Sequence, residues 1–174
     1  MKDWENDKRW SDRFLPEIKR ELGNFLMCEP KQEEDSLRNT DLIVIGFDSV
    51  RIACRIRKHK YLSEYGDQFT IRAGRASGNK TELTKIVEGW GDYLFYGFCD
   101  EHENKLFHWK IIDLKVFRLW FNRQIVRNQG VPPGDYKPNK DGKSKLAGFD
   151  VREMPPEAVA KEYTVQTVKL RAVN

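Results

Sequence analysis

The sequence lacks the long apolar runs that mark membrane spans and secretory leaders. Its opening stretch, MKDWENDKRW, contains no apolar core of the kind that a signal peptide needs. Nowhere does an apolar run approach the roughly 18 residues that a membrane helix requires. These absences predict a cytoplasmic protein.

Residues suited to disulfides, zinc or nucleotide phosphates are also scarce. The three cysteines have no C-x-x-C spacing, and the three histidines, His59, His102 and His108, lie far apart along the chain. The glycine-rich stretch GRASG lacks the Lys-Ser/Thr ending of a phosphate-binding P-loop. We therefore expect reduced cysteines in the core and no zinc site.

The sequence does contain enough apolar mass for one α/β domain with its own core. Of its 174 residues, 39% are hydrophobic and 12% are aromatic, alongside 33% that are charged. The net charge of +4 is modest by itself. However, residues 51–80 carry eight basic side chains against two acidic ones, which indicates a local basic surface.

Hydrophobic spacing predicts an α/β core over residues 1–127. Its elements are predicted as a helix over 10–28, strands over 41–47, 50–57 and 68–72, a helix over 80–88, a β-hairpin over 93–99 and 105–112, and a helix over 116–127. Residues 128–145 are rich in Pro, Gly and Lys and are predicted as a flexible loop that could order on a partner. Residues 146–174 are predicted as a C-terminal extension, with a helix beginning at Pro155, that packs on the core.

The second predicted strand, VRIACRIR, alternates apolar and basic residues. Burial of Ile52, Cys54 and Ile56 would turn the arginines to the opposite face. Basic residues of the neighbouring strand and of the glycine-rich turn extend this face into a track suited to phosphates. The predicted nucleic-acid-binding residues are Arg51, Arg55, Arg57, Arg72, Arg75 and Lys80. Alternatively, the same residues only protect strand edges against pairing.

The order of elements, with Asp41 opening the DLIVI strand, resembles the PD-(D/E)xK nuclease superfamily. The stretch GDYLFYGFCDEHENKLFHWKII is similar to the late strand and hairpin of small nuclease-like members. The resemblance covers about residues 10–115. It implies a restriction-endonuclease-like α-β-β-β-α-β core, in which a central mixed sheet is flanked by helices. It further implies a Mg²⁺-dependent endonuclease with Asp41 as a metal ligand, from a phage or a mobile element.

The sequence departs from that superfamily at its second motif, an acid or glutamine two residues before a lysine. These positions hold Ala53 and Arg55, and a guanidinium stays protonated and cannot act as a base. A substitute carboxylate would be needed, because Mg²⁺ requires one or two. The expected metal ligands are Asp41, Asp35 and Glu21, with Glu17, Glu34, Glu82 and Asp92 as further candidates; the expected catalytic residues are Asp41, Arg55 and Arg57.

Three functions remain open at this point. The first is a Mg²⁺-dependent nuclease in which arginines stabilise charge on the scissile phosphate. The second is a catalytically inactive module that binds nucleic acid, most simply DNA, or that inhibits a host defence enzyme. The third is a domain whose basic face meets an acidic protein partner. Ala53 favours the second over a conventional nuclease, whereas Asp41 favours the first.

Overall fold

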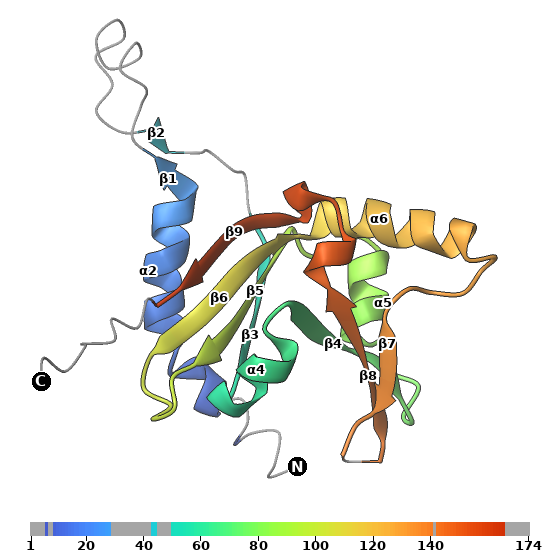
Figure 1. The fold of residues 1–174 in the computed structure, drawn as a ribbon, viewed down its shortest axis with the longest axis horizontal. Coiled ribbons are helices and arrows are strands. Elements are labelled where there is room, and N and C mark those ends of the chain that lie inside the picture. Colours follow the sequence, from blue (N-terminus) through green and yellow to red (C-terminus); the bar gives the residue numbers. More distant parts are fainter. Residues whose placement is uncertain (1–5, 7–8, 29–42, 45–49, 141, 166–174) are drawn as a thin grey trace, which may run out of the picture.

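The described part of the fold consists of two larger β-sheets and a two-stranded ladder, with helices packed around the larger sheets (Figure 1). The computed structural model describes residues 6, 9–28, 43–44, 50–140 and 142–165, and the structural statements that follow concern these residues. No helix in this part of the chain is long and apolar enough to cross a membrane. The α/β class expected from the sequence is confirmed.

The central sheet is mixed and has the strand order β3-β5-β6-β9. Strand β3 runs parallel to β5, while the β5–β6 and β6–β9 pairs are antiparallel. All but the first residue of β5 are buried, because this strand is covered on both faces. The strands are β3 (Ile52–Arg57), β5 (Tyr93–Cys99), β6 (Leu106–Asp113) and β9 (Val159–Thr164).

The second sheet is antiparallel, with β8 between β4 and β7. Its strands are β4 (Gln68–Arg75), β7 (Asp135–Pro138) and β8 (Ser144–Asp150). A separate two-stranded ladder joins β1 (Met27–Cys28) to β2 (Ile43–Val44). Between β3 and β4 the chain forms a 3-10 turn, η1 (His59–Tyr61), and the short helix α4 (Leu62–Tyr65).

Two apolar clusters hold these layers together on opposite faces of the central sheet. On one face, helix α2 (Leu15–Leu26) and the residues just before it place Phe14 and Ile18 against Phe95 and Trp109 of the sheet. On the other face, the second sheet and two helices cover the alternate residues of β5. These helices are α5 (Glu82–Val87), capped by Thr81, and α6 (Leu114–Arg127), capped by Asp113. Aromatic side chains are prominent there, and the rings of Phe69, Phe117 and Phe149 contact one another.

The elements with strong local periodicity lie where the sequence predicts them. Helices α2, α5 and α6 and the β5–β6 hairpin are confirmed. The register of β3 is confirmed by Ile56, which is buried, and Ile52, which packs on the same cluster. Cys54 was expected in the core and is instead exposed, because β3 is an outer strand with β5 as its one described neighbour.

Three predictions differ from the structure. Residues 128–145 were expected to form a loop, but they contain β7 and the first residues of β8. The helix expected from Pro155 is a single 3-10 turn, η3 (Pro156–Ala158), followed by β9. Strands β3 and β4 were expected to be neighbours, yet they belong to different sheets, because β4 pairs with β8. The C-terminal part of the chain thus supplies strands to both sheets.

Candidate functional site: a basic cleft between the two sheets

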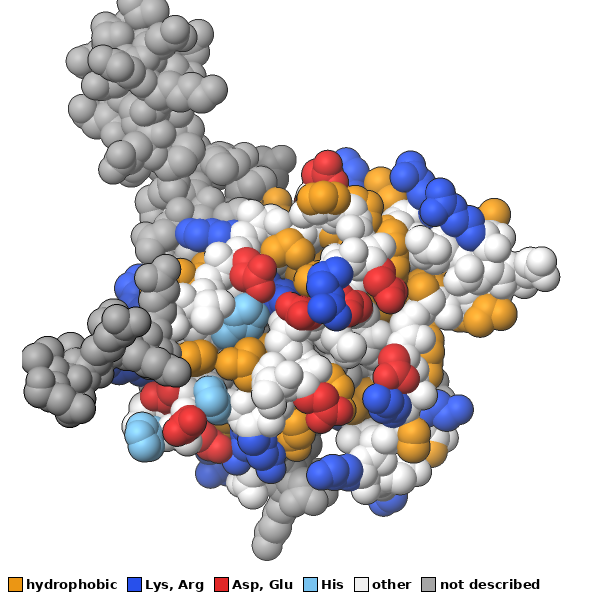
Figure 2. Space-filling view, in the orientation of Figure 1, with side chains coloured by type: hydrophobic (Ala, Val, Ile, Leu, Met, Phe, Trp, Pro, Cys, Tyr) orange, Lys and Arg blue, Asp and Glu red, His pale blue; other side chains and the backbone are white. Residues whose placement is uncertain are grey.

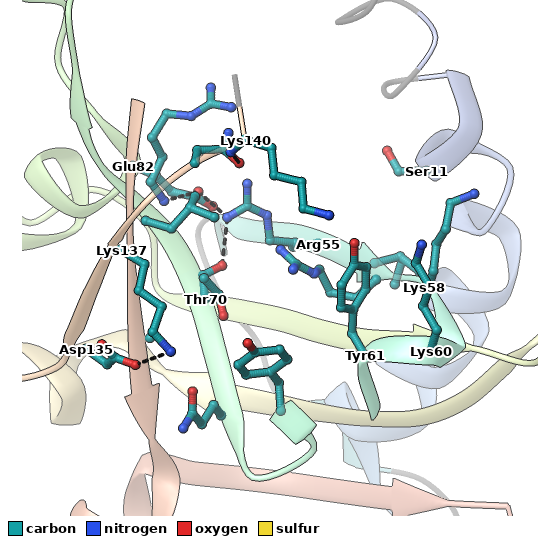
Figure 3. Close-up of a pocket in the computed structure, with 18 of the residues that line it drawn as sticks. Ser11, Arg55, Lys58, Lys60, Tyr61, Thr70, Glu82, Asp135, Lys137 and Lys140 are labelled. Atoms are coloured by element: carbon teal, nitrogen blue, oxygen red, sulfur yellow. Dashed lines mark hydrogen bonds and ion pairs between the residues drawn. The ribbon is translucent and has the colours of Figure 1, made fainter. Parts of the chain in front are cut away.

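A cleft of about 920 Å³ opens between the outer strand β3 and the second sheet. One wall comes from β3 and the segment that follows it, which includes η1 and α4. The other wall comes from β7 and the turn after it, and β4 and β8 contribute the residues between the walls. Figure 3 shows this arrangement, with Lys58 and Lys60 on one side, Lys137 and Lys140 on the other, and Arg55 between them.

Positive side chains dominate this cleft. Its two lining carboxylates are Glu82 and Asp135, and its seven cationic lining residues are Arg55, Arg57, Lys58, Lys60, Arg72, Lys137 and Lys140. The face of the molecule shown in Figure 2, by contrast, mixes acidic, basic and apolar side chains.

Arg55 is fixed between the two sheets. Its Nη1 donates one hydrogen bond to the carbonyl oxygen of Thr70 at 2.7 Å and another to Glu82 Oε2 at 2.9 Å. Glu82 Oε2 also accepts a hydrogen bond from the backbone N–H of Arg72 at 3.3 Å. The Arg55 and Glu82 side chains are 23% and 29% exposed, so the pair lies deep but is open to solvent. Arg55 therefore offers its remaining N–H groups to a ligand that enters the cleft.

The wall beside η1 combines cations with tyrosine. The guanidinium carbon of Arg57 lies 4.9 Å from the Tyr61 ring centroid, and Lys60 Nζ lies 5.3 Å from it. Both are cation–π distances. These contacts position two cations at the cleft without neutralising their charge, unlike a salt bridge.

Glu103 in the β5–β6 turn ties this wall to the N-terminal helical segment. Its Oε2 accepts a hydrogen bond from Trp10 Nε1 at 2.7 Å, and its Oε1 lies 2.8 Å from Lys58 Nζ. The hydrogen bond to Glu103 raises the pKa of Lys58, and the same contact lowers the pKa of Glu103. Both groups therefore stay charged at neutral pH.

The opposite wall is the β7–β8 hairpin. Lys137 Nζ lies 2.7 Å from Asp135 Oδ2, and this hydrogen bond raises the pKa of Lys137. The same Nζ is 6.0 Å from the Tyr65 ring centroid, so the two walls come together at this end of the cleft. Lys140 extends from the turn after β7 toward the opposite wall (Figure 3).

Four of the seven cations have no described carboxylate as an ion-pair partner. They are Arg57, Lys60, Arg72 and Lys140, whereas the other three pair with Glu82, Asp135 or Glu103. The Arg72 Nε atom is also buried without a hydrogen-bond partner. Uncompensated cations on the walls of a cleft create a field that attracts anions, since the low-dielectric walls screen it less than bulk water does.

The predicted basic residues fall into two groups. Arg55, Arg57 and Arg72 line the cleft together, although they come from different sheets. Arg51 is exposed elsewhere, over the Trp90 ring at 5.9 Å, and Lys80 pairs with Glu88 at 2.8 Å. Arg75 is exposed and, like Arg51 and Lys80, does not line the cleft. Three of the six predicted residues thus line the cleft, and they lie on strands of two different sheets rather than on neighbouring strands of one sheet.

The predicted metal ligands are not brought together among the described residues. Asp41, Asp35 and Glu34 lie outside them. Glu21 pairs with Arg20 at 3.3 Å, Glu17 accepts the backbone N–H of Leu106, and Asp92 accepts that of Arg51.

Described carboxylates do not make up a magnesium site in the cleft. Its two carboxylates, Glu82 and Asp135, each form an ion pair with a basic side chain. The positive charge of that side chain opposes the binding of a metal cation to the same carboxylate. No cluster of three or more His, Cys, Asp or Glu residues that could hold a metal ion occurs in the described part of the chain.

Four of the seven cationic residues that line the cleft were not predicted from the sequence as site residues. Lys137 and Lys140 come from the segment that was expected to be a loop. The lysine content of that segment, and its expected ordering on a partner, were the sequence signals that pointed to a role in binding. Lys58 and Lys60 belong to the basic stretch of the sequence but follow the strand pattern that drew attention to the arginines. Tyr61 had no distinguishing pattern.

Comparisons with protein-family models, with curated proteins and with solved structures found no significant match to this chain.

Proposed function

We propose that the protein binds nucleic acid in this cleft, through contacts to phosphate groups. The supporting observation is the set of four lining cations without a described carboxylate partner, which occur on both walls and between them. Phosphate chains supply repeated negative charges, and their neutralisation by Lys and Arg releases counterions. A binding module with no catalytic role is the function that the described residues support best.

A diverged restriction-endonuclease-like core is a further proposal. It is supported by the mixed sheet with its parallel β3–β5 pair and by helices on both faces. Arg55, at the position of the superfamily's lysine, lines the cleft and contacts the carboxylate of Glu82. Phosphodiester cleavage is the second candidate function, in which Arg55 stabilises charge on the scissile phosphate and Asp41 serves as the metal ligand that the superfamily resemblance implies.

Binding is tested by fluorescence anisotropy with labelled oligonucleotides over a range of salt concentrations. With four cations engaged, the slope of log affinity against log salt should be about −3. In Lys60→Ala/Lys140→Ala, which removes one cation from each wall, affinity should fall and the slope should become shallower by about one per lost contact. All sequences should weaken alike, because phosphate contacts carry no base information.

The matched control is Arg51→Ala/Arg75→Ala, which removes the same charge from exposed positions outside the cleft. It should retain most of the affinity. Equal losses in the two double variants would mean that general charge attraction, not the cleft, explains binding. Absence of salt-dependent binding to any oligonucleotide would overturn the proposal and favour an acidic protein partner.

Cleavage is tested on supercoiled plasmid, single-stranded DNA and RNA with Mg²⁺ or Mn²⁺. The nuclease proposal expects metal-dependent cleavage that is lost in Asp41→Ala, with the circular dichroism spectrum unchanged. No cleavage of any substrate by a folded sample that binds nucleic acid would leave the binding function alone.

A further inference from the structure

We propose that the cleft accepts a single strand of nucleic acid in preference to a duplex. This inference rests on the proposed function and specifies its ligand. Three observations carry it: the depth at which Arg55 lies, the distribution of the cations over two facing walls, and the tyrosines among them.

The depth of the cleft limits what can reach its cations. Arg55 lies between the walls and contacts Thr70 and Glu82, so a ligand must enter the cleft to touch it (Figure 3). A volume of about 920 Å³ is close to the roughly 1,000 Å³ upper size of pockets that enclose small ligands. A cleft of this volume encloses only a small part of a duplex, whose major groove alone is about 12 Å wide, so we infer that a duplex rests on the rim.

The two walls present cations to the same space. Lys60 lies on one side and Lys140 on the other, with Arg55 between them (Figure 3). A single strand lying along the cleft would bring successive phosphates within reach of both walls at once. A duplex across the mouth would contact the rim lysines but leave the deeper guanidinium groups unpaired, and that loss lowers its affinity.

Tyrosines and arginines supply planar surfaces for unpaired bases. Tyr61 and Tyr65 both line the cleft, and their ring centroids are 6.5 Å apart. The Arg57 guanidinium lies over Tyr61, and Lys137 lies near Tyr65. Grooves that bind single strands combine such aromatic rings with basic side chains, because the rings and the guanidinium planes stack on bases of any sequence. In a duplex the base faces are already stacked and cannot make these contacts.

The first test compares the affinity of a single-stranded oligonucleotide with that of the blunt duplex of the same sequence, at one salt concentration. The single strand should bind at least about tenfold more tightly. Tyr61→Leu should weaken single-strand binding by about tenfold, because stacking of one base is lost. Tyr61→Phe keeps the ring and should retain the affinity, which separates stacking from any effect on folding.

The second test uses Cys54 as a reporter, because it is exposed and lines the cleft, whereas Cys99 is buried. Peptide mapping by mass spectrometry measures the rate at which N-ethylmaleimide modifies Cys54 in the wild-type protein. A bound single strand should slow this modification several-fold. The duplex, at a concentration that gives equal occupancy in the anisotropy assay, should slow it much less.

The outcomes separate this inference from the proposed function. If the duplex binds as tightly as the single strand and protects Cys54 equally, while Lys60→Ala/Lys140→Ala weakens both, the cleft binds duplex and the single-strand proposal is wrong. If no nucleic acid binds, or if Cys54 reacts at the same rate in every complex, the cleft is not the binding site and both proposals fail.

Discussion

Arg55 on the outer strand of the central sheet and Glu82 at the start of helix α5 form an ion pair, with 2.9 Å between Nη1 and Oε2. The pair joins the central sheet to the layer that packs on it, and it places a negative charge inside a basic cleft. Glu82 therefore has two opposing effects on an anionic ligand. It orients Arg55, and it repels phosphate.

The substitution Glu82→Gln should separate these effects. Glutamine keeps an oxygen that can accept the hydrogen bond from Arg55, but it removes the charge. Affinity for a single-stranded oligonucleotide should rise, by up to about tenfold, because repulsion of the order of 1 kcal/mol is removed. Glu88→Gln, which changes the same charge at a position paired with Lys80 outside the cleft, is the control. Weaker binding in Glu82→Gln alone would contradict this prediction.

Lys110→Met should be considerably more destabilising than Glu162→Gln. Lys110 has no exposed surface, and its Nζ donates a hydrogen bond to the carbonyl oxygen of Gly66 at 2.7 Å and lies 3.2 Å from Glu162 Oε1. Methionine fills the volume but leaves the Gly66 carbonyl without its donor, at a cost of about 1–3 kcal/mol. Glutamine at position 162 keeps an oxygen that can accept a hydrogen bond from Lys110 Nζ, so the loss should be smaller, about 1 kcal/mol. Urea unfolding of both variants measures the difference, and equal losses would refute the prediction.

Protonation of His108 should destabilise the fold in mild acid. Burial, and then the nearby charge of Lys110, lower the pKa of His108 from its ordinary value of 6.5. The unfolded chain therefore takes up this proton at a higher pH than the folded chain does. The free energy of unfolding should fall as pH drops below about 6.5, and this contribution should level off below the folded pKa.

Urea unfolding between about pH 7 and pH 5 measures this dependence. His108→Gln should flatten the profile in that range, because it removes the titrating group. His102→Gln, in the exposed turn of the β5–β6 hairpin, is the control and should leave the slope due to His108 in place. A His108→Gln profile as steep as the wild-type profile would rule out His108 as its source.

Gly134→Ala should destabilise the hairpin that forms one wall of the cleft. Gly134 has φ +106°, and an added Cβ would lie 2.8 Å from a ring carbon of Phe149 and 2.9 Å from the carbonyl oxygen of Gly148. Gly130 has a similar φ of +95°, but nothing lies within 4 Å of its added Cβ. Both alanine variants should lose about 1–2 kcal/mol from backbone strain. Gly134→Ala should lose about 2 kcal/mol more from overlap with the core. Equal losses of stability on thermal unfolding of the two variants would contradict the expected overlap of the added Cβ with Phe149 and Gly148.

The elements that the sequence predicts correctly are those with a local cause. Helix α6 has its aspartate cap and its apolar spacing within one stretch, and the β5–β6 hairpin needs only two adjacent strands and a turn. The alternation in β3 correctly predicts that Ile56 is buried, and the Arg55 and Arg57 side chains line the cleft. In each case, the residues that determine the structure are near neighbours in the chain.

The elements that the sequence does not predict either lack an apolar pattern of their own or pair with a strand far away in the sequence. All four residues of β7 are exposed, so this strand has no apolar alternation and exists through its pairing with β8. Strand β4 shows the expected alternation, but its sheet is decided by its pairing with β8, which places Gln68 opposite Asp150, far away in the sequence. A pattern within β4 carries no information about which strand will pair with it.

The sequence by itself determined the α/β class, the main helices, the central hairpin and the basic character of the stretch from Arg51 to Lys80. Only the tertiary structure decided which cations share a site. It brings Arg55 and Arg72 together from separate sheets and sets Lys137 and Lys140 opposite them, while Arg51 and Lys80 lie elsewhere. The physical reason is that the alternation of residues along a strand determines which face carries the charged side chains. A cleft, by contrast, is created by long-range packing between sheets.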